Sequence, residues 1–264
     1  MCFKKPNFIF TEPFDFRLIS ATINDYPGSM NDLRGCNNDG RLVKDTVLSY
    51  KYNADVLRLI DSQATVSAVT NAISSAISLL KPGAIVCILA DSCFSGDITR
   101  LMMNFMGSIP TPENYKRNRF YQTPGVVPTV NYPLFHKSGD IRWIAMGGCG
   151  KVAYSADAYI NGDYYGAFTY YAMNSLRFDM TYRQWYEAIK KYLPSSLFEQ
   201  DPTFMGPDDL LDSIIGYRQT LWIHNSSHGT QLNGTNGDSV DEAICLYDGN
   251  LRDKVYYNIL NKLK

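Results

Sequence analysis

The sequence is short of histidine and has no excess of charge. Three of its 264 residues are histidines, and the formal net charge is -1. Without a basic excess there is no electrostatic case for nucleic acid or an anionic membrane surface as a partner. No run of about 18 apolar residues occurs, so the sequence predicts no membrane-spanning helix. The histidines that could serve as a general base are therefore only three, His136, His224 and His228.

Closely paired cysteines are also absent. The six cysteines are scattered along the chain, and none belongs to a Cys-x-x-Cys pair. Such spacing fits neither a disulfide framework nor a zinc site, so we expect reduced thiols and a cytoplasmic location. The N-terminal residues hold only a brief apolar stretch, which is too short for the core of a signal peptide.

What is present is the pattern of an α/β protein. Hydrophobic residues make up 45% of the chain and charged residues 19%. Short apolar runs alternate with segments of helical periodicity. The expected strands are 17–23, 56–60, 84–89, 141–146 and 220–223, and the expected helices are 38–49, 65–80, 166–176, 182–192 and 253–263. This alternation predicts a mostly parallel sheet with helices on both faces, a three-layer α/β/α sandwich.

Residues 105–138 interrupt that pattern. They contain five prolines and the basic cluster Lys116-Arg117-Asn118-Arg119. A long segment without hydrophobic periodicity is typical of a loop, so we expect a mobile linker here. His136 lies within it, and we discount this histidine as a base.

Two strand ends carry groups suited to covalent chemistry. Cys93 follows the apolar run 84–89, and His228 follows the run 220–223, each in a loop of small polar residues and glycine. Ligands and catalytic groups collect at the carboxyl ends of strands in such sheets, and a thiol beside an imidazole forms a nucleophile and its base. The Gly229 N–H can point at a developing oxyanion. His224 lies inside its strand run and is expected to be structural.

Several stretches together resemble the metacaspase and orthocaspase branch of the caspase-like cysteine peptidases. The matching residues are 23–26, 33–39, 91–96 (Asp-Ser-Cys-Phe-Ser-Gly), 155–158, 166–170, 181–185, 227–231 (Ser-His-Gly-Thr-Gln) and 241–245. The resemblance implies a caspase-like fold and a cysteine endopeptidase. In it Cys93 attacks the scissile carbonyl, His228 assists proton transfer to the leaving amine, and the N–H groups of Gly229 and Cys93 stabilise the oxyanion.

The order of the segments departs from the family, in which the histidine segment precedes the cysteine segment. We therefore expect one peptidase domain over 1–264 with rearranged connectivity. Its parts are the first strands, helices and cysteine loop (1–104), the linker (105–138), a small-subunit-like part (139–217) and a transposed histidine unit (218–264). The unit is expected to dock between the first strand and the cysteine strand of its own chain, giving a monomer; exchange of the unit between two chains is the alternative.

The resemblance also implies an acidic pocket that accepts arginine or lysine before the scissile bond. The matching positions are Asp39, Asp91, Cys36 and Ser226. Two carboxylates in one dry pocket suit a guanidinium, so peptides and proteins with Arg or Lys at the cleavage site are the expected partners. In the alternative interpretation, Asp39 caps the first helix and Asp91 satisfies loop amides. If the pocket exists, the basic cluster in the linker is a candidate site of self-cleavage; otherwise it is a solvated group of charges.

Calcium activates many members of that family through a cluster of aspartates. By the preference of calcium for oxygen ligands, the candidates here are Asp238, Asp241, Asp248 and Asp253. The paired acidic residues that the family has after the last strand read Arg252-Asp253 here, and the often acidic position beyond the cysteine loop is Arg100. We expect no required cofactor and weak calcium dependence or none.

Two other classes compete with the peptidase. A transposed unit that misplaces His228 slightly would leave an inactive caspase-like module that binds partners, because small misplacements cost large factors in rate. An α/β hydrolase or a nucleotide-binding domain is excluded, since the chain has no nucleophile elbow and no phosphate-loop motif.

Overall fold

The middle layer of the protein is a six-stranded sheet in the order β2-β1-β9-β3-β5-β8. The computed structural model describes residues 9–28, 31–92, 115–121, 123–126, 142–149, 154–234 and 240–263. The strands are β1 (Phe16–Thr22), β2 (Asp55–Ile60), β3 (Ile85–Asp91), β5 (Ile144–Gly147), β8 (Thr203–Met205) and β9 (Thr220–Ser226). All neighbouring pairs are parallel except β5 with β8.

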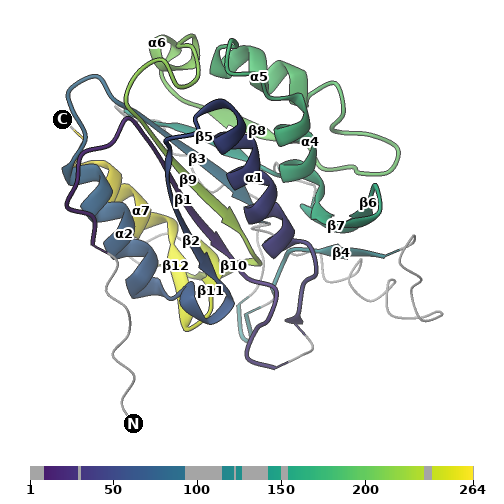
Figure 1. Cartoon of the computed structure of the whole chain (residues 1–264). Coiled ribbons are helices and arrows are strands. Elements are labelled where there is room, and N and C mark those ends of the chain that lie inside the picture. The colour runs from purple at the N-terminus through teal and green to yellow at the C-terminus, as the bar shows by residue number, and fades with distance from the viewer. Residues whose placement is uncertain are drawn as a thin grey trace.

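Helices cover both faces of this sheet (Figure 1). On one face lie α2 (Val66–Ser78) and α7 (Asp253–Leu260), and on the other lie α1 (Cys36–Tyr50), α4 (Ala167–Ser175) and α5 (Tyr182–Ile189). The short helices η2 (Asp61–Gln63) and α6 (Asp208–Leu211) lie in connections. Successive side chains of a strand point to opposite faces, so Val86 and Ile88 of β3 enter one core while Cys87 and Leu89 enter the other. The predicted three-layer sandwich is therefore correct.

β9, the strand of the predicted histidine unit, lies in the interior of the sheet. β9 pairs in parallel with β1 on one side and with β3 on the other, so the expected docking between the first strand and the cysteine strand is confirmed. In this register Ser226 pairs with both Thr22 and Asp91. The carboxyl ends of β1, β9 and β3 therefore lie side by side at one edge of the sheet. Trp222 anchors β9 on the α5 face, where its ring stacks on Trp185 with centroids 5.2 Å apart.

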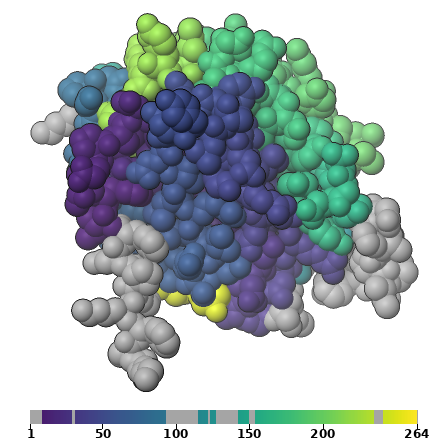
Figure 2. Space-filling view, viewed as in Figure 1, coloured from purple at the N-terminus to yellow at the C-terminus, as the bar shows by residue number. Residues whose placement is uncertain are grey.

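In the space-filling view, side chains fill the spaces between the helices and strands on the face seen in Figure 1 (Figure 2). In this view the C-terminal residues, coloured yellow, reach the surface only as a small patch at the lower edge. The described helices include none that is both long and apolar enough to cross a bilayer.

The prediction that strands and helices alternate throughout is wrong in two places, where small antiparallel sheets form. One contains β4 (Lys116–Asn118), β6 (Ala156–Ile160) and β7 (Asp163–Gly166), and the other β10 (Gly229–Asn233), β11 (Val240–Leu246) and β12 (Gly249–Arg252). The β6–β7 hairpin turns through Asn161 and Gly162, which have φ values of 50° and 91°. An Asn-Gly pair is the usual sequence of such a two-residue turn, so the signal was present.

The expectation of a mobile linker is wrong for residues 115–121. Lys116–Asn118 pair with β6 as β4, and the following Arg119 has no exposed surface. Phe120 is also buried. Prolines and asparagines around this segment concealed a short strand that another strand holds in place. The rest of the predicted linker lies outside the described residues, apart from 123–126.

Candidate active site

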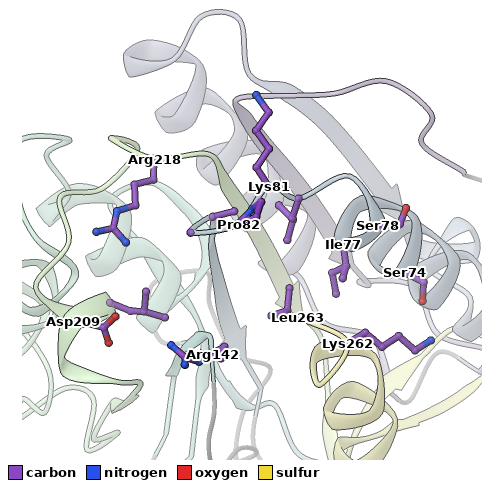
Figure 3. A pocket seen from close by; sticks show the side chains of 14 residues that line it. Ser74, Ile77, Ser78, Lys81, Pro82, Arg142, Asp209, Arg218, Lys262 and Leu263 are labelled. Atoms are coloured by element: carbon purple, nitrogen blue, oxygen red, sulfur yellow. The ribbon is translucent and has the colours of Figure 1, made fainter.

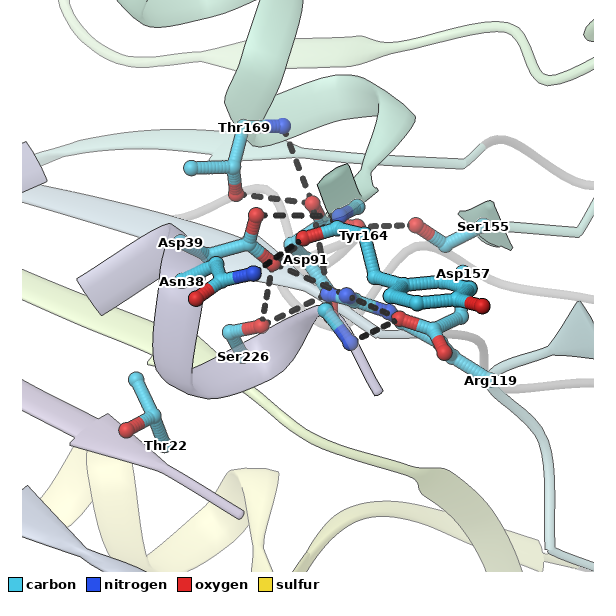
Figure 4. A network of polar contacts seen from close by, with 12 residues as sticks. Thr22, Asn38, Asp39, Asp91, Arg119, Ser155, Asp157, Tyr164, Thr169 and Ser226 are labelled. Carbon is cyan, nitrogen blue, oxygen red and sulfur yellow. Dashed lines mark hydrogen bonds and ion pairs between the residues drawn. The ribbon is translucent and has the colours of Figure 1, made fainter. Parts of the chain in front are cut away.

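The carboxyl ends of the central strands gather a cluster of buried acidic groups (Figure 4). Asp91 ends β3, Ser226 ends β9, and Asp39 lies in the first turn of α1. None of the three side chains is exposed. The N-cap position of α1 is Gly35, and no side chain caps it. The alternative in which Asp39 caps this helix is therefore wrong: its carboxylate accepts instead from the Ser226 hydroxyl at 2.7 Å.

Arg119 from the predicted linker fills this cluster (Figure 4). Its Nη2 lies 2.8 Å from Asp39 Oδ2 and 2.9 Å from Asp157 Oδ1. Its Nη1 donates to Ser226 Oγ at 2.6 Å and lies 3.4 Å from Asp91 Oδ2. Three of the four predicted pocket residues thus bind the guanidinium of the chain's own arginine. Arg119 is therefore not a solvated charge, whereas Lys116 of the same basic cluster is exposed.

The buried carboxylates of this cluster need a cation to balance their charge. A single guanidinium faces three carboxylates, and none of these four side chains is exposed. Burial raises the pKa of Asp39 to about 8; the guanidinium of Arg119 opposes this rise, and the charge of Asp91 adds to it. Burial alone would lower the pKa of Arg119, but the carboxylates of Asp91, Asp39 and Asp157 raise it well above its usual value. Removing the cation would leave buried negative charge without compensation.

The fourth predicted pocket residue, Cys36, lies beside Ser226. The thiol is fully buried, and burial raises its pKa well above the usual range, although Arg119 acts in the opposite direction. Cys36 therefore contributes an uncharged wall to the cluster and is no candidate nucleophile.

Asp157 belongs to the acidic cluster, and the sequence reasoning missed it. Besides Arg119, its carboxylate binds the backbone N–H groups of Arg34 and Gly35, at 2.8 and 2.9 Å, and the hydroxyl of Tyr115. It lies in the matching stretch 155–158, but an aspartate in a short run gives no sign that it points inward. The β6–β7 hairpin supplies that information.

A glycine makes room for the guanidinium. A Cβ atom on Gly166 would lie 2.5 Å from Arg119 Nη1 and would collide with Asp91. The Gly166 N–H also donates to Asp39 at 2.9 Å. Gly166, at the end of β7, therefore forms a wall of the cluster that no other residue type can supply.

The backbone of Arg119 is held on both sides. Its N–H donates to the Ser155 carbonyl at 3.0 Å, and its carbonyl accepts from the Gly229 N–H at 2.8 Å. Together with the β4–β6 pairing, these bonds hold residues 116–119 as an added antiparallel strand on β6. Gly229 is the residue predicted to bind an oxyanion, and here it binds the carbonyl oxygen of an arginine.

His228 lies next to this carbonyl, between β9 and β10. Its backbone N–H donates to the hydroxyl of Tyr26 at 2.8 Å, and the two rings are 5.1 Å apart. Nε2 lies 2.8 Å from the carbonyl oxygen of Asn31, which can only accept, so Nε2 carries the proton. Among the described residues Nδ1 has no hydrogen-bond partner. Burial lowers the pKa of His228 to about 4, so the ring is neutral and Nδ1 offers a lone pair.

Cys93 lies outside the described residues, and so does the rest of its loop up to residue 114. The described part ends at Ser92, which is buried and directly follows Asp91. The placement of Asp91, Ser226 and His228 fixes where the neighbouring strand ends lie, but the separation of the Cys93 and His228 side chains is not among the described contacts.

His224 has the structural place that was expected for it. It is buried in β9, with its ring nitrogens 3.0 Å from Ser20 Oγ and 3.4 Å from Thr169 Oγ1. Burial lowers its pKa to about 3, with the positive charges of Arg119 and Arg58 adding to the effect. The ring is therefore neutral and serves as a hydrogen-bonded part of the core.

This buried neutral ring predicts a measurable pH effect on stability. The unfolded chain protonates His224 as the pH falls through 6.5 whereas the folded chain does not until about 3, so folding is weakened across that window. We expect the stability advantage of the wild type over His224→Gln to shrink by about 2 kcal/mol between pH 7 and pH 5. Urea unfolding of both proteins measures it. The difference between them is needed because the raised pKa of Asp39 acts in the opposite direction; a gap that stays constant contradicts the prediction.

The calcium candidates are occupied by other interactions. Asp241 is buried and forms ion pairs with Arg252 and Lys254, at 2.6 and 2.7 Å. Asp248 accepts the N–H of Val66 at the start of α2, and Asp253 lies in the first turn of α7. Asp238 lies outside the described residues. Within the described ranges no group of three His, Cys, Asp or Glu side chains is placed to hold a metal ion.

The described cavity lies far from these residues, at the amino ends of β3 and β9 (Figure 3). It has a volume of about 560 Å³ and is lined by Pro82, Leu210 and Leu263 among others, with Lys81, Arg142, Arg218 and Lys262 also on its lining. None of the candidate catalytic residues contributes to it.

Comparisons with known proteins add little to this geometry. No family model matches the chain, and no curated protein matches it. Among solved structures, the chain is similar to the crystal structure of protein GSU0716 from Geobacter sulfurreducens, a structural-genomics target. The identity is 14% and the TM-score 0.49, over 77% of this chain and 99% of that one.

Proposed function

We propose that this protein is a cysteine endopeptidase that cleaves peptide bonds after arginine or lysine, as its resemblance to metacaspases implies. One observation carries the proposal. Arg119 inserts its guanidinium among Asp39, Asp91 and Asp157 while its carbonyl oxygen accepts from the Gly229 N–H. This is the pose that a bound substrate needs before the bond following an arginine is cut.

The proposed chemistry uses Cys93 and His228. Nδ1 of His228 takes the thiol proton of Cys93, and the sulfur attacks the scissile carbonyl carbon. The Gly229 N–H stabilises the negative charge that develops on the carbonyl oxygen. His228 then gives the proton to the departing amine as the C–N bond breaks. Water hydrolyses the resulting thioester, which releases the carboxylate and restores the thiol.

Arginine is preferred over lysine in this proposal. The planar guanidinium reaches two carboxylates and a hydroxyl at the same time, as Arg119 does with Asp39, Asp157 and Ser226. A lysine ammonium ion on the same stem carries its charge at one point and makes fewer of these bonds.

Self-cleavage of the intact chain tests the proposal. Incubated wild-type protein is expected to split between Arg119 and Phe120, whereas Cys93→Ala stays whole, because it lacks the nucleophile. Arg119→Gln is also expected to escape this cut, while Arg117→Gln is cut like the wild type, since the Arg117 guanidinium donates to the carbonyl of Asp32. Intact-mass spectrometry over time follows all four proteins.

The same occupied cluster also favours a second candidate, an inactive caspase-like module. Arg119 would then be a permanent internal ion-pair partner that keeps the pocket closed. The two functions differ in one result. A wild type that never cuts itself, together with an Arg119→Gln protein that is folded but cleaves no arginine peptide, would establish the inactive module and reject the peptidase.

A further inference from the structure

We propose that this site also recognises the residue that follows the scissile bond, and that it prefers an aromatic side chain there. The inference rests on the proposed function and extends it from the arginine to the next position. It comes from the surroundings of Phe120, which occupies that position in the chain's own segment.

Phe120 lies in a small apolar subsite. Its side chain is 5% exposed and packs with Cys149, which is equally buried, and with Tyr154. The Cys149 thiol donates to the carbonyl of Ser92 at 3.4 Å. The subsite therefore adjoins the residue that precedes Cys93, where the departing half of a substrate must lie.

The backbone after Arg119 is also bound. Phe120 forms a parallel bridge with Gly229, and the Tyr121 N–H donates to the Gly229 carbonyl at 2.8 Å. Two residues further on, the hydroxyls of Thr123 and Thr230 are 2.7 Å apart. Residues before the bond lie on β6 and residues after it lie on β10, so the protein holds both halves of a substrate strand.

An aromatic ring suits this subsite for two reasons. A ring buries a large apolar area against Cys149 and Tyr154, which a small residue leaves unfilled. An acidic residue there would lose its hydration and would lie near the carboxylates of the cluster. Selection by an apolar subsite of this kind amounts to about tenfold between a ring and a methyl group.

Cleavage of short peptides tests the proposal in the Arg119→Gln protein, whose pocket is empty of its own arginine. Three internally quenched peptides carry residues 115–121 with Phe, Ala or Asp at the position of Phe120. We expect kcat/KM for the Phe peptide to exceed that for the Ala peptide about tenfold, with the Asp peptide slowest. The chain's own Phe120 competes equally with all three, so the ratios are unaffected. Equal rates overturn the proposal while leaving the peptidase function intact.

A matched pair of cysteine variants locates the effect. Cys149→Ala is expected to reduce the Phe-over-Ala preference severalfold. Cys87→Ala removes a fully buried sulfur from the core of β3 and is expected to leave the ratio unchanged. A loss of preference in both variants, or in neither, assigns the selection to something other than this subsite.

Binding separates this inference from a failure of catalysis. The Cys93→Ala, Arg119→Gln double variant cannot cut, so fluorescence anisotropy of labelled peptides measures recognition alone. The Phe peptide is expected to bind about tenfold more tightly than the Ala peptide. If this difference is found but no variant cleaves any peptide, the subsite exists and the peptidase function is wrong. If no difference is found, the subsite is rejected whatever the catalytic result.

Discussion

Replacing Arg119 with glutamine is expected to raise the turnover of an added arginine peptide at least about tenfold over the intact wild type. The chain's own arginine is tethered beside the pocket at an effective concentration in the millimolar range, so an added peptide must compete with it. Glutamine cannot form the ion pairs with Asp39 and Asp157. Initial rates with an arginine-terminated fluorogenic peptide, measured before self-cleavage develops, give the ratio.

Arg117→Gln is the matched control for this experiment. It removes the same charge from the same strand, but its side chain binds the Asp32 carbonyl and leaves the acidic cluster filled. Its turnover is expected to equal that of the wild type. Because the empty cluster holds uncompensated carboxylates, circular dichroism must first establish that Arg119→Gln is folded. A folded Arg119→Gln protein with unchanged turnover contradicts competition by Arg119.

Loss of a carboxylate from the cluster is expected to lower kcat/KM for the arginine peptide by about ten- to hundredfold. In the Arg119→Gln background, Asp39→Asn and Asp157→Asn each remove one acceptor of the substrate guanidinium from a site that excludes water, where a hydrogen bond to a charged group has its largest effect. A peptide with aspartate in place of arginine is expected to remain uncut by all of these proteins. Steady-state kinetics with both peptides measures the change.

Asp163→Asn provides the control for these substitutions. Asp163 lies in β7 close to the cluster in sequence, but it is exposed and pairs with Arg41 at the surface. Exposed pairs contribute little, so the rate is expected to stay within about twofold. A preference for the aspartate peptide in any of the proteins would overturn the assignment of an arginine pocket.

The elements that build the sheet could be read from the sequence because their signals are local. The apolar runs of β1, β3 and β9 and the periodicity of α2 each lie within a few consecutive residues. The position of β9 followed from a resemblance whose segments occur in an unusual order. Local propensity alone gives no reason to place it between β1 and β3.

The contents of the acidic cluster could be predicted only in part. Asp39, Asp91 and Ser226 were found by resemblance, but Arg119 and Asp157 were not, because nothing local in a basic, asparagine-rich segment marks one arginine as buried. Its contacts join residues 80 and 107 positions apart, and they arise only after β4 pairs with β6. The segment was predicted to be a mobile linker because of its composition. It forms a strand because it pairs with β6, which its composition does not indicate.

The central position of β9 has a consequence for biosynthesis. The residues of β1 that pair with β9 are synthesised early. Ser20 of β1 and His224 of β9, whose side chains are hydrogen-bonded, are 204 positions apart in the sequence. Until the ribosome has released β9, the strand pairs β1–β2 and β3–β5 have no strand between them and cannot join into one sheet. Closing so distant a pairing is slow compared with local contacts. Ser226 therefore reaches a half-built scaffold, and the acidic cluster that it forms with Asp39 and Asp91 cannot assemble before synthesis has passed β9.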